Sequence, residues 1–246
     1  MRRWIAAAAL VLLGAGQARA FEVGARAAYW VPALSGEVRL DGTLPGTRVD
    51  LADDLGITDE NFFFGDAWVW LGDHHLTLSA ARIDYSGSET LSGVVFGDHT
   101  FSGPTDTSIE YTVLDLTYRY DLVDLENVLA GLSVGPELQA KYLDGEVRME
   151  AAGVEERRSF QIPVPMVGLG GHVGILADLL EVRARIAIIS LRGDRVLEAS
   201  GEVAFSPLPF VDLTAGYRHF DIDVEEGDLL LSYTQSGPYV GLGIVF

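Results

Sequence analysis

Residues 110–122, EYTVLDLTYRYDL, alternate apolar and polar side chains with a period of two. This alternation predicts a β-strand with one face toward an apolar phase and the other toward water. Two tyrosines end the apolar row, which is typical of the aromatic girdle at a membrane surface. The apolar face carries Thr112, Leu114, Leu116, Tyr118 and Tyr120, and the other face carries Val113, Asp115, Thr117, Arg119 and Asp121.

The same alternation recurs in four further stretches of the chain. One such strand would also fit a soluble β-sandwich, but the repetition favours a membrane barrel with lipid outside and water inside. The outward residues predicted for these stretches are Val128, Ala130, Leu132, Val134, Pro136, Leu138 and Tyr142, then Val182, Ala184, Ile186 and Ile188, then Val211, Leu213, Ala215 and Tyr217, and finally Val240, Leu242, Ile244 and Phe246.

Counting all candidate segments gives ten strands, an even number that suits a single-chain bacterial barrel. We therefore predict an all-β fold, a transmembrane antiparallel up-and-down β-barrel of ten strands. If the short link LRGDRV between the seventh and eighth strands is misread, the barrel has eight. The predicted strands are 21–33, 61–72, 74–90, 108–121, 127–148, 158–175, 180–192, 196–206, 210–224 and 229–246.

The links between these segments assign the two ends of the barrel. Short links fit periplasmic turns, and long links fit outer loops. We expect long outer loops at 34–60 and 87–107. Within the first loop, LADDLGI (residues 51–57) has two acidic residues in its first half and Gly56 near its end, which predicts one helical turn over the barrel mouth. The predicted inner turns are Gly72–Asp73, Asp121–Glu126, Leu176–Leu179 and Ser206–Pro209.

The faces of residues 61–85 are not settled by the pattern. A turn near Asp73 is expected to place Asp66, Trp68 and Trp70 on one face with Leu76, Leu78, Ala80, Arg82 and Asp84. The charges favour the lumen, because each would cost a few kcal/mol in lipid, whereas the tryptophans and leucines favour lipid. A β-bulge that switches faces would reconcile the two.

The first 20 residues carry Arg2 and Arg3, an apolar stretch from Trp4 to Ala15, and small residues at Ala18 and Ala20. This is the pattern of a secretory signal peptide, and the apolar stretch is too short for the roughly 20 residues of a membrane helix. We expect cleavage after Ala20, with residues 1–20 as signal peptide and 21–246 as the barrel.

Cleavage would remove Arg2, Arg3 and Arg19 and no acidic residue, which leaves 14 basic and 36 acidic residues, a balance of -22. Nucleic acid is an improbable partner for so acidic a chain, because binding to phosphate backbones depends on clustered Lys and Arg. The chain has no cysteine, which excludes catalytic thiols and disulfides. Its mean hydropathy of +0.22 is high for a chain with 22 % charged residues, yet no stretch after residue 20 is long and apolar enough for a membrane helix. The apolar residues must therefore be distributed along the chain, as in a barrel.

Charged residues on the inward faces are expected to form a solvated ion-pair network that fills the lumen, since unpaired charges there would be costly. We predict no catalytic, cofactor-binding or metal-binding residues. Two pairs are expected across strands: Arg218 with Glu198, and His172 with Arg183. The inward charges are Asp115, Arg119, Glu137, Lys141, Glu181, Arg183, Arg185, Asp212 and Arg218.

The histidines offer the one argument for an enzyme, because omptin proteases and lipid A deacylases are outer-membrane barrels with catalytic groups near the outer rim. Here only His99 and His219 are expected on that side, and neither lies in a matching motif. His74, His75 and His172 are expected near the inner turns. Acidic outer segments at 50–60 and 223–228 lack calcium-loop spacing and fit solvated charge.

The last strand, YVGLGIVF, ends in Phe246, and it resembles the C-terminal strand of Gram-negative outer-membrane β-barrels of the small OmpA/OmpX/OmpW-like type. Ile244 stands where many of these have a second aromatic residue. The segment VDLADDLGITDENFFFGD also resembles outer loops of uncharacterised members. The resemblance implies a bacterial outer-membrane location, contact with lipid and lipopolysaccharide, recognition of the last strand by the barrel-assembly machinery, and a monomer.

Closure of the barrel requires the last strand to pair with the first, because an open edge in lipid would leave backbone groups without partners. We expect that seam near Val23 to Tyr29, with Phe246 facing lipid. Two roles remain open: a structural or surface-interaction barrel with a filled lumen, or a passive pore for small solutes. The glycines on inward faces, such as Gly135 and Gly216, would help a pore.

Overall fold

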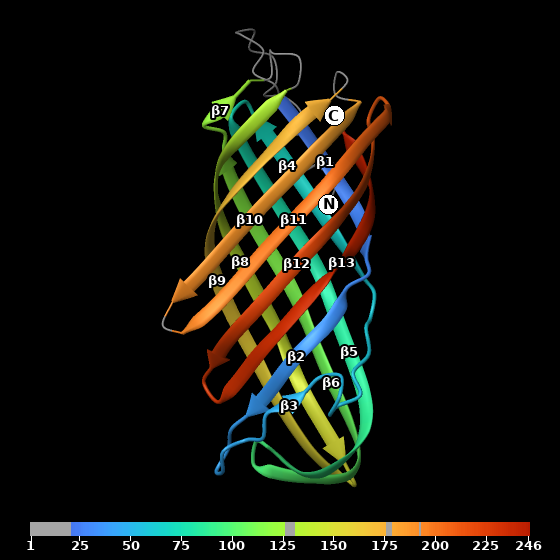
Figure 1. The fold of residues 1–246 in the computed structure, drawn as a ribbon, viewed down its shortest axis with the longest axis vertical. Helices are drawn as coiled ribbons and strands as arrows, with labels where there is room; N and C mark the ends of the chain where they lie inside the picture. The colour runs from blue at the N-terminus through green and yellow to red at the C-terminus, as the bar shows by residue number, and fades with distance from the viewer. Residues whose placement is uncertain (1–20, 126–130, 176–178, 192) are drawn as a thin grey trace, which may run out of the picture.

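A computed structural model describes residues 21–125, 131–175, 179–191 and 193–246. The predicted signal peptide, the predicted outward residues Val128 and Ala130, and parts of the predicted inner turns at 121–126 and 176–179 lie outside these ranges. Within the described chain, ten antiparallel wall strands form a closed barrel, with β1 and β2 acting as one wall strand because both pair with β13 (Figure 1). The ten-strand prediction is confirmed and the eight-strand alternative is wrong. The strands are β1 (Phe21–Trp30), β2 (Ala33–Leu40), β3 (Val49–Asp50), β4 (Phe62–Leu71), β5 (His74–Phe96), β6 (His99–Tyr120), β7 (Val123–Asp124), β8 (Leu132–Ala151), β9 (Val154–Ile175), β10 (Leu180–Leu191), β11 (Asp194–Leu208), β12 (Val211–Glu226) and β13 (Leu229–Val245).

The first and last strands close the barrel. Their register runs from Gly24 opposite Val245 to Trp30 opposite Tyr239. At the end of the seam, the Val23 N–H donates to the Phe246 carbonyl over 3.0 Å, and the Phe246 N–H donates to the Val23 carbonyl over 2.8 Å. The predicted closure is therefore confirmed, and no edge remains open at this seam.

An apolar belt surrounds the half of the barrel in which β1 begins and β13 ends. Figure 1 shows this half at the top of the barrel. Its side chains point outward and are exposed, as the alternation predicts for strands in lipid. Aromatic residues border it, including the pair Tyr29 and Phe63 with ring centroids 5.0 Å apart. The belt includes Leu76, Leu78, Leu114, Leu116, Tyr118, Val134, Leu138, Val167, Leu169, Val182, Ile186, Ile188, Val203, Phe205, Leu213, Tyr217, Val240, Leu242, Ile244 and Phe246.

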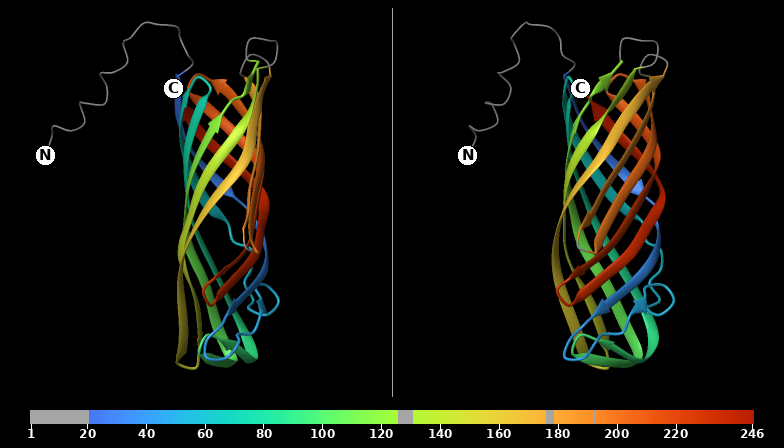
Figure 2. Two further views of the ribbon diagram at one scale, coloured as in Figure 1. Left: turned by 90° about the vertical axis from the view of Figure 1, so that its left-hand side faces the viewer. Right: turned by 60° about the vertical axis from the view of Figure 1, so that its left-hand side comes forward.

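Two long hairpins, β5–β6 and β8–β9, extend far past the belt, whereas the β10–β11 hairpin ends much sooner (Figure 2). The expected outer loop at 87–107 is wrong, because these residues continue β5 and β6 to a tight turn at Gly97, whose φ is +62°. The expected loop at 34–60 is also partly wrong, since β2 continues the first wall strand. We name the projecting part the head: residues 33–60, 82–110, 143–165, 193–197 and 219–236.

Polarity is inverted in the head. The strands keep the same inward and outward positions, except that β5 changes phase at the irregularity between Ser92 and Val94, but the inward side chains there are apolar and the outward ones polar. The head is therefore built like a soluble β-sandwich, with a dry core between its sheets. That core includes Val38, Leu40, Ile83, Tyr85, Phe96, Phe101, Ile109, Leu143, Val147, Met149, Phe160, Ile162, Phe220, Ile222, Val224, Leu229, Leu231 and Tyr233.

The expected shared face in residues 61–85 is wrong. The two-residue turn Gly72–Asp73 pairs Trp70 with His75 and Trp68 with Thr77, so even-numbered residues of β4 share the lumen with odd-numbered residues of β5. Leu76 and Leu78 consequently face lipid. The described β4–β5 ladder runs without a register shift, so a bulge is not needed.

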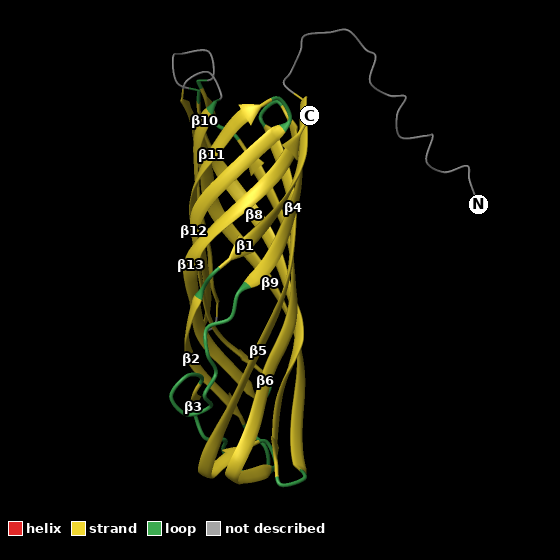
Figure 3. Ribbon diagram, turned by 90° about the vertical axis from the view of Figure 1, so that its right-hand side faces the viewer, coloured by secondary structure: helices red, strands yellow, loops and turns green. Residues whose placement is uncertain are grey.

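A strap, residues 41–61, fills the wall opening between β2 and β5 beyond the start of β4 (Figure 3). It contains the predicted helical turn: the Asp50 carboxylate caps it by accepting from the N–H groups of Ala52 and Asp53, and Gly56 ends it with φ +64°. Leu51, Leu55 and Ile57 of the strap are buried in the head core. The turn therefore lies in the wall and not over the mouth, because its apolar side chains gain more from burial.

No helix among the described residues is long and apolar enough to cross a membrane.

Candidate functional site: the lumen inside the belt

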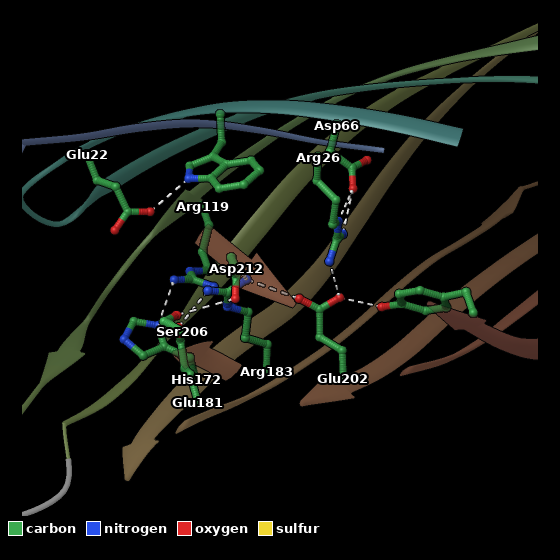
Figure 4. A network of polar contacts seen from close by, with 12 residues as sticks. Glu22, Arg26, Asp66, Arg119, His172, Glu181, Arg183, Glu202, Ser206 and Asp212 are labelled. Carbon is green, nitrogen blue, oxygen red and sulfur yellow. Dashed lines mark hydrogen bonds and ion pairs between the residues drawn. The ribbon is translucent and has the colours of Figure 1, made fainter. Parts of the chain in front are cut away.

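The lumen inside the belt holds the basic residues of that part of the chain. In the described part of the barrel wall that carries the belt, each Lys and Arg points inward, as predicted for a barrel in lipid. Acidic side chains surround them and form a network of ion pairs, of which Figure 4 shows the part around Arg183 and Glu202. The basic members are Arg26, Arg119, Lys141, Arg183, Arg185 and Arg218, and the acidic members are Asp66, Asp115, Asp121, Glu137, Glu181, Glu198, Glu202 and Asp212.

Arg183 connects the inner end of the network. Its guanidinium lies 2.6 Å from the Glu181 carboxylate, 3.3 Å from Glu202 and 3.5 Å from Asp212 (Figure 4). It also lies over the Trp70 ring, 5.7 Å from the centroid. The register places Arg183 opposite His172, which confirms the predicted pairing.

Arg26 joins the wall seam to the opposite side of the lumen. Its guanidinium is 2.5 Å from the Asp66 carboxylate and 2.8 Å from that of Glu202. The Tyr239 hydroxyl also donates to Glu202. β1, β4, β11 and β13 thus hold one cluster, so its charges are compensated across strands far apart in sequence.

Lys141 occupies the outer end of the network and is 2 % exposed. Its ammonium contacts the Asp115 carboxylate and lies 2.9 Å from Glu198. Arg218 lies 2.9 Å from Glu198, so the predicted ion pair is confirmed. The expected cross-strand register is nevertheless wrong: Arg218 lies opposite Ser200 and Glu198 opposite Phe220, because the turn is centred near Pro209 and not near Leu208.

A cavity of about 150 Å³ remains between these side chains. Its lining includes Arg26, Trp70, Arg185 and Glu202, with charges of both signs. A space of this size and polarity suits a few bound waters. Over the described ranges, no group of three His, Cys, Asp or Glu side chains is placed to hold a metal ion.

The head core closes the lumen at the end of the network that holds Lys141. Phe220 lies over Lys141, with the ammonium 5.4 Å from the ring centroid. Beyond it the Tyr233 hydroxyl donates to Tyr111 over 2.9 Å, and the Gln235 amide donates to the Tyr85 hydroxyl over 3.0 Å. These polar contacts mark the boundary between the charged lumen and the apolar core.

The two outer histidines lie outside this site. His219 alternates with the inward Arg218 and Phe220, and its ring contacts the Ser236 hydroxyl at 2.6 Å. His99 lies at the β5–β6 tip, 2.7 Å from the Glu156 carboxylate. The inner histidines are placed as predicted: His75 pairs with Asp121 at 2.7 Å, and His172 contacts the Ser133 hydroxyl at 2.9 Å.

Sequence reasoning missed several members of the network. Arg26 and Glu202 were not among the predicted inward charges, the face of Asp66 was left open, and Asp121 was predicted inward without a partner. Alternation in GARAAYW and SGEVAF carries the signal that places Arg26 and Glu202 inward. All nine predicted inward charges are members of the network.

The fold is that of a small outer-membrane β-barrel. No protein-family model and no curated protein sequence matches this chain. Among solved structures, the outer-membrane protease OmpT from Escherichia coli matches with a TM-score of 0.58 at 8 % identity, over 92 % of this chain and 97 % of OmpT. Likeness at this identity describes the fold alone.

Two further outer-membrane barrels match more loosely. Ail of Yersinia pestis, in complex with the heparin analogue sucrose octasulfate, has a TM-score of 0.38 at 12 % identity, over 92 % of this chain and 99 % of Ail. Neisserial surface protein A has a TM-score of 0.34 at 14 % identity, over 91 % and 96 % of the two chains.

Proposed function

We propose that this protein is a closed, non-conducting outer-membrane barrel with a structural or surface-interaction role, which holds a rigid β-structured head outside the membrane. The observation that carries the proposal is the seal formed by the head core above the ion-pair network. A dry core packed like a protein interior leaves no continuous water path.

The charge network supports the same role. Opposite charges that compensate one another across the barrel fill space and brace the wall, whereas a pore needs an open water column. The inward glycines that would favour a pore are mostly covered. A Cβ atom at Gly135 would lie 1.9 Å from the Tyr120 carbonyl oxygen, and one at Gly216 would lie 2.6 Å from the Tyr239 ring.

Conductance in planar bilayers tests the proposal against the passive-pore alternative. Purified protein whose heat-modifiable migration shows a folded barrel is expected to give no steady conductance. A variant with Tyr111→Ala, Phe220→Ala and Tyr233→Ala should raise the frequency of openings, because it removes three side chains at the boundary of the seal. Steady conductance of the wild-type protein would overturn the closed-barrel proposal.

We also propose that the protein is not an enzyme. The outward position of His219 and the contact of His99 with Glu156 support this, since neither imidazole points into a lumen-facing cleft. Protease and lipid A deacylation assays on cells that display the protein should match those of cells without it. Activity lost with His99→Ala or His219→Ala would contradict the proposal.

The remaining parts of the proposal concern export and assembly. Residues 1–20 act as the signal peptide, the mature chain begins at Phe21, the last strand is read by the barrel-assembly machinery, and the barrel contacts lipopolysaccharide as a monomer. Terminal sequencing of membrane-fraction protein should give Phe21. A soluble periplasmic product, or a mature chain that retains Met1, would contradict it.

A further inference from the structure

The two longest unpaired strand edges in the described part of the head belong to β5 and β9. β5 pairs with β4 only as far as Ala81, opposite Phe64, and continues to Phe96. β9 pairs with β10 only between Ile175 and Val167, yet it extends outward to Val154. Exposed edges recruit other strands unless they are covered or blunted.

The strap covers the β5 edge. Its backbone at Leu55 and Gly56 lies directly on β5 at Gly87, where a Cβ atom would be 2.3 Å from the Leu55 carbonyl oxygen. Further out, the Thr47 N–H donates to the Val95 carbonyl over 2.7 Å. A strand added here would have to displace the strap and expose its buried leucines.

The β9 edge is only partly protected. The Gly174 N–H donates to the Gly131 carbonyl, so even-numbered residues of β9 bond to β8 and odd-numbered residues turn their backbone groups to the other side. Pro163 and Pro165 occupy two odd positions beside the end of the β10 ladder, and proline has no N–H to offer.

Beyond the prolines, four consecutive odd positions keep both donor and acceptor. In the described chain no strand pairs with β9 on this side past Val167. The charged side chains there already pair with β8: Glu155 lies 2.9 Å from Arg148, and Arg157 lies 3.5 Å from Glu146. The four positions are Glu155, Arg157, Ser159 and Gln161.

The charge of the head indicates what would approach this edge. The head segments contain 23 acidic and 7 basic residues, an excess of 16 negative charges. A field of this sign concentrates cationic chains and repels acidic ones. Backbone pairing supplies affinity in strand addition, and charge selects among extended chains.

We propose that residues 155–161 of β9 form a docking edge for an extended basic polypeptide segment, which adds to the head sheet as a further strand. The inference rests on the proposed surface-interaction role and names its partner class. The prolines confine the docked strand to the part of the edge distant from the membrane.

The test uses the full-length barrel in detergent micelles and a fluorescent peptide of alternating lysine and threonine, followed by anisotropy. The peptide should bind. The same peptide N-methylated on alternate residues, so that one edge lacks N–H groups, should bind at least tenfold more weakly, as should a glutamate–threonine peptide. Equal binding of either control peptide, or no binding of the basic one, would overturn the proposal.

Ser159→Pro provides the matched variant, because the chain already accepts proline at the equivalent positions Pro163 and Pro165. It should keep heat-modifiable migration and lose at least tenfold in affinity, whereas Ser159→Ala should bind normally. Unchanged binding by a folded Ser159→Pro variant would overturn the docking edge. Conductance of the same preparation is scored separately, so failure of the closed-barrel proposal is distinguishable from failure of the edge.

Discussion

Asp115 and Tyr111 point into the barrel from the same face of β6, four residues apart, yet they lie in opposite environments. The Asp115 carboxylate contacts the buried Lys141 ammonium, and the Tyr111 ring packs with Phe160 and Tyr233 of the head core. In the membrane part of β6 the inward side chains are polar, and in the head they are apolar. The strand makes this change while the same alternate residues continue to face inward. Val113, which lies between them, marks the change.

Single cysteines placed in this cysteine-free chain should map the inversion. Leu138 and Asp144 both point outward on β8, and Leu138 is 61 % exposed. A fluorophore at Leu138→Cys should be quenched by nitroxide lipids, and Asp144→Cys should react with an impermeant maleimide on intact cells. Leu143→Cys, which is inward, serves as the unreactive control. Lipid quenching at position 144 would contradict the two-part barrel.

Replacing Lys141 with methionine should destabilise the barrel by about 3–5 kcal/mol, because it leaves the carboxylates of Asp115 and Glu198 buried without their shared ammonium. The exposed pair of Arg82 with Glu110 gives the control, and Arg82→Met should cost about 1 kcal/mol or less. Urea midpoints of folded protein in detergent measure both. Equal losses would show that the lumen pairs contribute no more than surface pairs.

The strap contact at the head tip should depend on pH. The Thr43 N–H and hydroxyl both donate to the Asp98 carboxylate over 2.9 Å and hold the pKa of Asp98 below its ordinary value of 3.8. Because the pKa of Asp98 is lower in the folded protein than in the unfolded chain, the contact stabilises the strap at pH values above the ordinary pKa. This stabilisation is lost as the pH falls through the lowered pKa. His99 and Glu156 lie beside it.

Hydrogen exchange at the Thr43 amide, corrected for the intrinsic pH dependence, measures this effect. Protection should decrease below pH about 3.8, the ordinary carboxyl value. Asp98→Asn should remove the dependence across that range. A protection profile that is identical in the variant would assign the change to another group.

Adding a methyl group at Gly87 should loosen the strap. In Gly87→Ala the new Cβ atom would lie 2.3 Å from the Leu55 carbonyl oxygen, so the strap backbone must shift. Trypsin should then cut at the exposed Arg48 several-fold faster than in the wild-type barrel. Gly201→Ala is the matched control, since nothing lies within 4 Å of a Cβ atom there. Equal cleavage in both variants would show that the strap does not depend on this contact.

Deleting Phe246 should impair assembly far more than deleting Asp228. Phe246 exchanges two backbone hydrogen bonds with Val23 at the seam, and its ring lies 5.5 Å from that of Phe210. Asp228 lies in the outer turn between β12 and β13. Heat-modifiable migration at equal expression reports the folded fraction. If both deletions fold equally well, the terminal ring has no special role in closure.

The membrane part of the fold was predictable because lipid enforces a strict rule: apolar outside, with charges inside. Leu138, Ile186 and Val240 obey it, and their strands were placed correctly. The head segments at 34–40 and 87–107 were misread as loops because their outward positions hold Ser88, Thr90 and other polar residues while the core uses the opposite face.

The remaining errors of prediction concern how strands pair, because the register of two strands depends on residues far apart in the sequence. Two residues in a turn decide that Trp68 shares a face with Thr77 and not with Leu76. The ion-pair network could be predicted as a set of inward charges, but its partners depend on register across the barrel, as the diagonal contact of Arg218 with Glu198 shows. The seal required knowing that β5 and β6 continue past the membrane.

The continuity of β6 from the belt to the tip at His99 limits how the exposed surface of this protein can diverge. Inserting one residue midway along the strand would turn every side chain beyond it to the opposite face, placing charges in the core and core residues in water. Barrels with flexible outer loops can lengthen and shorten them freely. In this barrel, related sequences should differ on the cell surface by exchange of outward residues at fixed length, with insertions collected at the hairpin tips.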